Sequence, residues 1–194
     1  MLLASFIREG LSALDALYPA REARSLLLLL CGEVLGTSSY THIVEPSYAI
    51  APEKEGLLRE ALSRLAEGEP LQYILGKAHF AGRSFRVTPD VLIPRPETEL
   101  LVQEAVKLRP ARVLDLCTGS GIIAWSVALG VPGARVVAVD ISEKALEVAR
   151  TQPLPPNARP PAPCRPSLFR PMSWIRSRTF PSAPSTSSLP IRPM

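Results

Sequence analysis

Hydrophobic residues in the first third of the chain recur three or four positions apart, which predicts amphipathic helices. In the first helix these positions are Phe6, Ile7, Leu11, Leu14 and Leu17. That pattern stops before Pro19, and a second helix is predicted over residues 19–35 with Gly36 as its cap. A third is predicted from residue 52, a proline, to Gly68. Helices of this length with short connections predict a small helical bundle over residues 1–70.

The pattern changes after residue 70. Residues 71–75, 78–80 and 84–87 are short, rich in aromatic and β-branched side chains, and separated by Gly76 and Gly82. Such segments favour strands. We therefore predict a β-hairpin linker followed by a proline-rich loop over residues 71–95, joining the bundle to a second domain.

Residues 96–150 alternate between helical and strand patterns. Helical spacing returns over residues 97–108, followed by a strand at 112–117, a helix at 121–129 and a strand at 134–140. Ser142 is then a suitable N-cap for a last helix. Strands and helices in this order begin a doubly wound parallel sheet, so the predicted fold class is α/β, with an incomplete α/β domain over residues 96–150.

Residues 151–194 differ in composition from the rest of the chain. They hold 12 of the 21 prolines and none of the 11 glycines, so neither helix nor sheet can propagate. We expect this segment to be a disordered tail. A natural proline-rich interaction tail and a basic nucleic-acid tail are both conceivable. Because a helix is interrupted and acidic residues vanish at one point, we favour translation out of frame.

Charge, apolar runs and cysteines exclude several classes of protein. The tail carries six arginines and no acidic residue, so residues 1–150 have a net charge of −2 although the chain has +4. A basic patch for direct nucleic-acid binding is therefore not expected. No apolar run approaches the roughly 18 residues of a membrane span. Three widely spaced cysteines make neither a disulfide framework nor a metal site, which suits a cytoplasmic protein.

The sequence Asp115-Leu-Cys-Thr-Gly119-Ser-Gly121 joins the first predicted strand of the second domain to the next helix. Without side chains at the two glycines, a ligand can lie against the backbone at the helix N-terminus. Asp140 ends the following strand, where a carboxylate can accept hydrogen bonds from both hydroxyls of a ribose. The pattern predicts a site for a nucleoside cofactor.

Two cofactors, and a purely structural glycine turn, remain open on these residues. Gly119-x-Gly121-x-x-Ala124 satisfies the dinucleotide pattern G-x-G-x-x-G/A, which makes a NAD-dependent oxidoreductase an alternative. S-adenosylmethionine is bound by a similar turn that has an acidic residue inside the preceding strand. Asp115 occupies that place, so we favour S-adenosylmethionine.

Two upstream motifs, Glu69-Pro-Leu-Gln-Tyr-Ile-Leu-Gly76 and Ile93-Pro-Arg-Pro-Glu-Thr-Glu99, resemble the signature of the HemK/PrmC-type release factor glutamine methyltransferases. The resemblance implies a helical substrate-recognition domain followed by a Rossmann-like class I methyltransferase domain. It implies methyl transfer from S-adenosylmethionine to the side-chain amide nitrogen of the glutamine in the Gly-Gly-Gln motif of peptide chain release factors, without a metal. The related enzymes that methylate a ribosomal-protein glutamine are the nearest alternative.

The resemblance also implies roles for individual positions. The cofactor-binding residues would be Cys117, Thr118, Gly119, Ser120 and Gly121, with Asp140 on the ribose. A substrate-side loop beside the active site would contain Arg95, Thr98 and Glu99.

The chain departs from this family pattern at two points. Cys117 stands where glycine is most common, and the catalytic motif Asn-Pro-Pro-Tyr is absent from the 194 residues. In that motif the asparagine and a proline carbonyl accept hydrogen bonds from the substrate amide and aim its nitrogen at the methyl group. We therefore assign no catalytic residue and expect weak cofactor binding without methyl transfer. A non-catalytic binding fragment is the alternative of another class.

Overall fold

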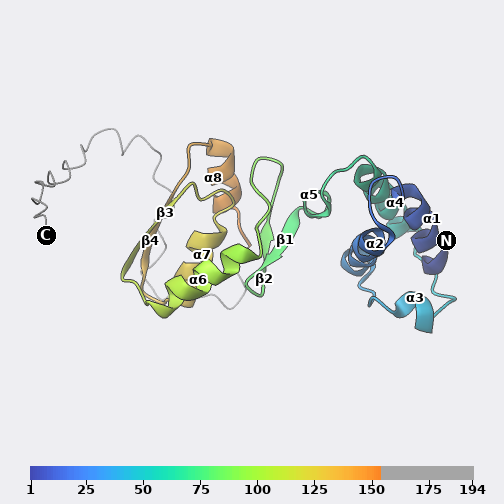
Figure 1. Ribbon diagram of the computed structural model, residues 1–194, viewed down its shortest axis with the longest axis horizontal. Coiled ribbons are helices and arrows are strands. Elements are labelled where there is room, and N and C mark those ends of the chain that lie inside the picture. Colours follow the sequence, from blue (N-terminus) through green and yellow to red (C-terminus); the bar gives the residue numbers. More distant parts are fainter. Residues whose placement is uncertain (154–194) are drawn as a thin grey trace, which may run out of the picture.

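The computed structural model describes residues 1–153. These residues form two lobes, with a helical lobe at the N-terminal end and a mixed helix and strand lobe after it (Figure 1). A short helix and a β-hairpin lie between the lobes along the chain and in space.

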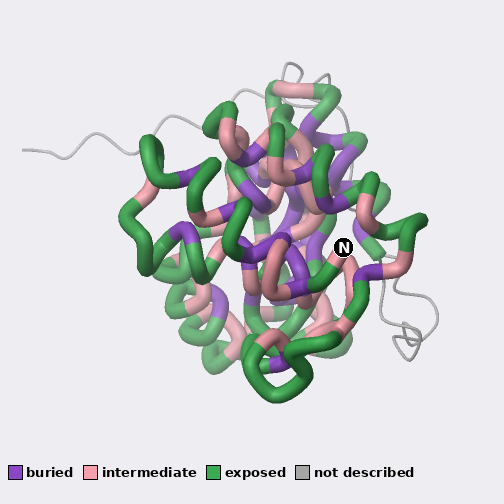
Figure 2. The backbone as a smooth tube through the Cα atoms, turned by 90° about the vertical axis from the view of Figure 1, so that its right-hand side faces the viewer, coloured by how far each residue is buried: buried purple, intermediate pink, exposed green. Residues whose placement is uncertain are grey.

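The helical lobe contains α1 (Leu3–Leu14), α2 (Ala20–Leu35), α3 (Thr41–Val44) and α4 (Pro52–Ala66). The three long helices confirm the predicted bundle, and Gly36 ends α2 in the left-handed conformation as expected. The short α3 was not predicted. The core of the lobe consists chiefly of Leu3, Phe6, Ile7, Leu14, Leu27, Leu30, Leu58 and Leu65. In an end-on view the buried segments of these helices face inward and the exposed ones outward (Figure 2).

Helices α1 and α2 cross closely because Gly10 of α1 has no side chain. A Cβ atom at Gly10 would lie 2.6 Å from a methyl carbon of Leu27, which is fully buried in α2. Glycine inside a helix normally costs about 0.5–1 kcal/mol relative to alanine. In α1 the absence of a side chain at Gly10 allows the two helices to approach.

The linker differs from the prediction at its start. Residues 71–75, expected to be a strand, form the helix α5 (Leu71–Leu75), so that prediction was wrong. Pro70 precedes the helix and Gly76 ends it in the left-handed conformation, while Leu71 is buried in the core of the helical lobe. Burial of one apolar side, together with a proline start and a glycine stop, outweighs the β propensity of the segment.

The predicted hairpin is present as β1 (Lys77–Phe80) and β2 (Arg83–Arg86), paired antiparallel. Its two loop residues, Ala81 and Gly82, both have positive φ, at 48° and 71°. Two-residue loops of this kind match the twist of the flanking strands. The hairpin attaches to the second lobe through a cluster of Phe80, Phe85, Val102 and Ile122.

The second lobe contains α6 (Glu97–Lys107), β3 (Arg112–Leu116), α7 (Ile122–Gly130), β4 (Arg135–Val139) and α8 (Glu143–Arg150). Strands β3 and β4 are parallel, with Asp115 opposite Ala138, which confirms the α/β prediction. Helix α7 covers one face of the pair through Ala124, Val136 and Ala138. Leu114 and Leu116 alternate to the other side of β3 and are 59% and 62% exposed.

The expected boundary at residue 150 shifts slightly. Thr151 is the C-cap of α8, and Gln152 is 7% exposed and hydrogen-bonded. The expected disorder is therefore wrong for these two residues: Thr151 ends α8 and is exposed, and Gln152 packs against the lobe. The expectations for residues 154–194 fall outside the described residues. Within residues 1–153, no helix has the length and apolar character needed to cross a membrane.

We predict opposite effects for alanine at two helical glycines. Gly10→Ala should lower the free energy of unfolding by about 1–3 kcal/mol, because the new methyl group overpacks against Leu27. Gly56→Ala in α4, where a Cβ meets nothing within 4 Å, should raise it by about 0.5–1 kcal/mol. Urea denaturation followed by circular dichroism measures both. Equal stabilisation by the two substitutions would show that α1 and α2 do not cross as closely as described.

Candidate functional site

The turn from Cys117 to Gly121 leaves the end of β3 and enters α7 through three residues in the left-handed region. The φ angles are 58° at Cys117, 56° at Gly119 and 80° at Gly121. At Gly121 a Cβ would lie 2.9 Å from that of Ala149 on α8, so close packing also requires glycine there. At Gly119 a Cβ would meet no atom within 4 Å. One side of the turn is therefore packed and the other is open.

The buried carboxylate of Asp115 holds the packed side. Its Oδ2 accepts hydrogen bonds from the hydroxyl of Thr118 at 2.7 Å and from the backbone N–H of Ala124 at 3.2 Å. Burial raises the pKa of Asp115, while these two hydrogen bonds act to lower it. The carboxylate thus joins the strand, the turn and the first part of α7.

Asp140 lies beside the open part of the turn. Its Oδ2 accepts from the backbone N–H of Gly119 at 2.8 Å, and its Oδ1 accepts from that of Ser142 at 2.9 Å. The contact follows from the parallel pairing of β3 and β4, which brings the residues after both strands to one edge. The structure therefore places Asp140 next to Gly119, and the role of both in cofactor binding stays a prediction.

The geometry of this edge fits a nucleoside cofactor. Each oxygen of the Asp140 carboxylate accepts one backbone hydrogen bond, which leaves further acceptor capacity for ribose hydroxyls. The open side of Gly119 lets a flat or extended ligand approach the backbone. Cys117 is exposed, whereas Thr118 and Ser120 are buried. Cys117 and Gly119 thus border the open side, and Thr118 and Ser120 face the packed side.

The predicted substrate-side residues lie elsewhere in the second lobe and the linker. Glu99, in the first turn of α6, accepts a hydrogen bond through Oε1 from the backbone N–H of Ala81 at 2.9 Å and so supports the hairpin loop. The backbone N–H of Thr98 donates to the carbonyl of Arg95 at 3.0 Å. Within residues 1–153, no hydrogen bond connects these three residues to the glycine turn, and their substrate contact stays a prediction.

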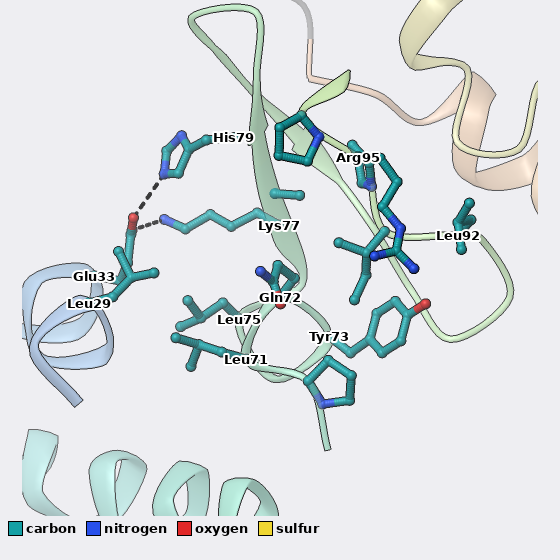
Figure 3. Close-up of a pocket in the computed structure, with 15 residues that line it drawn as sticks. Leu29, Glu33, Leu71, Gln72, Tyr73, Leu75, Lys77, His79, Leu92 and Arg95 are labelled. Atoms are coloured by element: carbon teal, nitrogen blue, oxygen red, sulfur yellow. Dashed lines mark hydrogen bonds and ion pairs between the residues drawn. The ribbon is translucent and has the colours of Figure 1, made fainter. Parts of the chain in front are cut away.

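Arg95 lines a groove of about 570 Å³ between the lobes. The groove is formed by α2, α5, β1 and residues 92–96, and none of its lining residues belongs to the glycine turn. Figure 3 shows Glu33 of α2 reaching Lys77 and His79 of β1 across one side. Hydrogen bonds from Lys77 and His79 lower the pKa of Glu33. This ion-pair cluster ties the helical lobe to the hairpin.

Sequence reasoning missed the contacts that α8 and its end make with the site. Trp125 of α7 donates through Nε1 to the carbonyl of Ala149 at 2.8 Å. Gln152 bonds both to the turn and to β2. The apolar residues Leu146 and Ala149 mark the buried side of α8 in the sequence, but hydrophobic spacing gives no signal for the polar Gln152 beyond the end of the helix.

We predict that Cys117→Gly stabilises the protein by about 1 kcal/mol, because glycine adopts a φ of 58° without steric strain. Cys117→Ala is the matched control: it removes the thiol but keeps the Cβ atom, and should leave the free energy of unfolding within about 0.5 kcal/mol of the original. Thermal and urea unfolding measure both. A larger gain from alanine than from glycine would contradict the assignment of strain to the backbone.

We also predict a pH-dependent difference for Asp115→Asn. Above the raised pKa of Asp115 the buried charge opposes folding, and below it the protonated carboxyl does not. The stability of the original chain relative to Asp115→Asn should therefore fall as pH rises through that pKa. Urea titrations between pH 4 and 8 measure the difference, and a value independent of pH would refute the prediction. Asp115→Ala should lower the free energy of unfolding by about 1–3 kcal/mol at neutral pH, because the hydroxyl of Thr118 and the backbone N–H of Ala124 lose their acceptor.

Comparisons of the sequence with known proteins give a match for each of the two lobes. Residues 6–76 match the family model of the PrmC N-terminal domain, and residues 96–159 match that of the methyltransferase small domain. The release factor glutamine methyltransferase of Bacteroides thetaiotaomicron is 43% identical over 150 residues, covering 76% of this chain and 53% of the relative. That of Bordetella pertussis is 46% identical over 135 residues, covering 68% and 48%.

The chain spans about half the length of the curated relatives it matches. A more distant relative, the release factor glutamine methyltransferase of Flavobacterium psychrophilum, is 33% identical over 157 residues, covering 77% of this chain and 55% of the relative. The two matched domains occur in the order that the sequence motifs predicted. Over its helical lobe and the beginning of its α/β lobe, the chain belongs to the family of the release factor glutamine methyltransferases.

Proposed function

We propose that the open side of the glycine turn, together with Asp140, binds S-adenosylmethionine. The observation that carries this proposal is the position of the Asp140 carboxylate, 2.8 Å from the backbone nitrogen of Gly119 and beside space that no side chain fills. The carboxylate would accept hydrogen bonds from the ribose hydroxyls, and the turn would contact the methionine part. When bound, S-adenosylmethionine supplies a methyl group activated by its sulfonium charge.

The packed side of the turn favours this cofactor over a dinucleotide. In dinucleotide sites the N-terminus of the helix faces a pyrophosphate. Here the backbone N–H of Ala124 in α7 is already bonded to the carboxylate of Asp115. An ionised carboxylate at this place would repel a pyrophosphate, whereas S-adenosylmethionine has no phosphate. The names of the relatives support the same choice.

For the reaction of the whole protein, with its catalytic motif, we propose methyl transfer to the side-chain amide of a glutamine in peptide chain release factors in the cytoplasm. The relatives are named release factor glutamine methyltransferases, which supports this substrate over a ribosomal protein. An amide nitrogen is a poor nucleophile and needs acceptors that orient its lone pair. Because the 194 residues hold no Asn-Pro-Pro-Tyr, we propose that this chain binds cofactor without transferring the methyl group.

Titration calorimetry tests the cofactor. We expect S-adenosylmethionine to bind and NAD not to bind, and we expect Asp140→Ala to weaken binding at least tenfold, because the ribose loses its acceptor. Asp90→Ala is the control, since Asp90 pairs with Lys144 on the surface. Alkylation of Cys117, mapped on its peptide, should slow when cofactor is present, because the exposed thiol borders the site. Binding of NAD alone would contradict the proposal.

Methyl transfer is tested separately with purified release factor and S-adenosylmethionine carrying a labelled methyl group. No label should reach the release factor from this chain, while a full-length relative such as that of Bacteroides thetaiotaomicron serves as the positive control. Label on the glutamine of the Gly-Gly-Gln motif would overturn the proposed inactivity and leave the proposed cofactor in place.

A further inference from the structure

Gln152 bonds to three backbone groups of two residues, Ser120 and Arg86, that are far from each other in the sequence. Its Nε2 donates to the carbonyl of Ser120 in the glycine turn at 2.8 Å and to the carbonyl of Arg86 in β2 at 2.9 Å. Its Oε1 accepts from the backbone N–H of Arg86 at 2.7 Å. Both amide hydrogens and the amide oxygen are therefore used, and the residue is 7% exposed.

Among residues 1–153, Gln152 donates the side-chain hydrogen bond that holds the turn at the carbonyl of Ser120. Asp115 fixes Thr118 and the start of α7, and Asp140 fixes the backbone of Gly119. The carbonyl of Ser120 lies between these anchors and is bonded to Gln152. Gly119 and Gly121 flank Ser120 and have no side chains, so backbone hydrogen bonds contribute much of what fixes the conformation of the turn.

The same side chain also joins the turn to the hairpin. The backbone of Arg86 is held through both its N–H and its C=O, as a strand neighbour would hold it. The hairpin is in turn bonded to α6 where Glu99 supports Ala81. Gln152 thus couples the position of the cofactor turn to the hairpin that leads toward the helical lobe.

We infer that Gln152 is a positioning residue for cofactor binding: its amide fixes the carbonyl of Ser120 and thereby keeps the open side of the Gly119–Gly121 turn in a binding conformation. This inference rests on the cofactor site proposed above. It assigns a role to a residue that follows α8 and reaches the turn through the backbone carbonyl of Ser120. Gln152 therefore acts through Ser120 and not by direct contact.

The test compares two nearly isosteric substitutions at adjacent positions. Gln152→Met keeps the volume of the side chain and removes all three hydrogen bonds. Thr151→Val is the matched control. Thr151 bonds to the end of α8 and to the Arg86 side chain, and among the described residues no hydrogen bond joins it to the turn. Both variants are made in the full 194-residue chain. Two readouts are taken: amide hydrogen exchange and affinity for S-adenosylmethionine.

We expect Gln152→Met to accelerate exchange of the Gly119 and Gly121 amides about tenfold at a temperature well below unfolding, with β3 and β4 unchanged. Thr151→Val should leave the turn amides as they are. The dissociation constant for S-adenosylmethionine should rise about tenfold in Gln152→Met alone. Uniform acceleration across the second lobe would show that Gln152 only stabilises the fold, and would overturn the inference.

The two proposals fail in different ways. If the original chain binds no S-adenosylmethionine, the proposed cofactor is wrong, and the exchange measurement still decides whether Gln152 orders the turn. If the original chain binds the cofactor and Gln152→Met binds it equally well, the positioning role is wrong while the cofactor site stands. Turn amides that exchange at the same rate in both variants contradict the inference directly.

Discussion

The second lobe depends on how the backbone N–H groups around the glycine turn find acceptors. Three residues of the turn have positive φ, so after the bond from the backbone N–H of Thr118 to the carbonyl of Val139 it leaves the sheet, before the hydrogen bonds of α7 begin. Two carboxylates supply acceptors instead: Asp115 from within β3 and Asp140 from beyond β4. An unsatisfied buried donor costs about 1–3 kcal/mol, so the turn would be unstable without them. The same arrangement leaves one side of Gly119 open to a ligand.

The linker between the lobes is held at both ends by long-range contacts. On one side, Glu33 of α2 pairs with Lys77 and His79 of β1. On the other, Glu99 of α6 supports the hairpin loop, and Phe80 packs with the second lobe. The groove lined by Arg95 lies between these attachments. Arg95 and Glu99, from the second of the two motifs that carried the family resemblance, therefore lie at the connection between the lobes.

Local sequence patterns were sufficient to predict the position and type of most helices and strands. Helical spacing predicted α1, α2, α4 and α6, and the parallel pair followed from strands separated by a helix. The failure at residues 71–75 has a tertiary cause, because Leu71 is buried in the core of the helical lobe and Pro70 and Gly76 delimit a short helix. A five-residue segment has too few positions for periodicity to distinguish helix from strand.

For the candidate site, the sequence by itself determined the turn, since Gly119, Gly121 and the acidic residues at 115 and 140 follow from spacing and strand order. Spacing along the chain carries that information because neighbouring parallel strands end at one edge. Only the tertiary structure decided which groups accept or donate hydrogen bonds at those carboxylates. It also decided that Glu99 bonds to the hairpin loop and that Gln152 bonds to Ser120 and Arg86. Those partners are up to 66 residues apart, and contacts of that range depend on packing that no local pattern encodes.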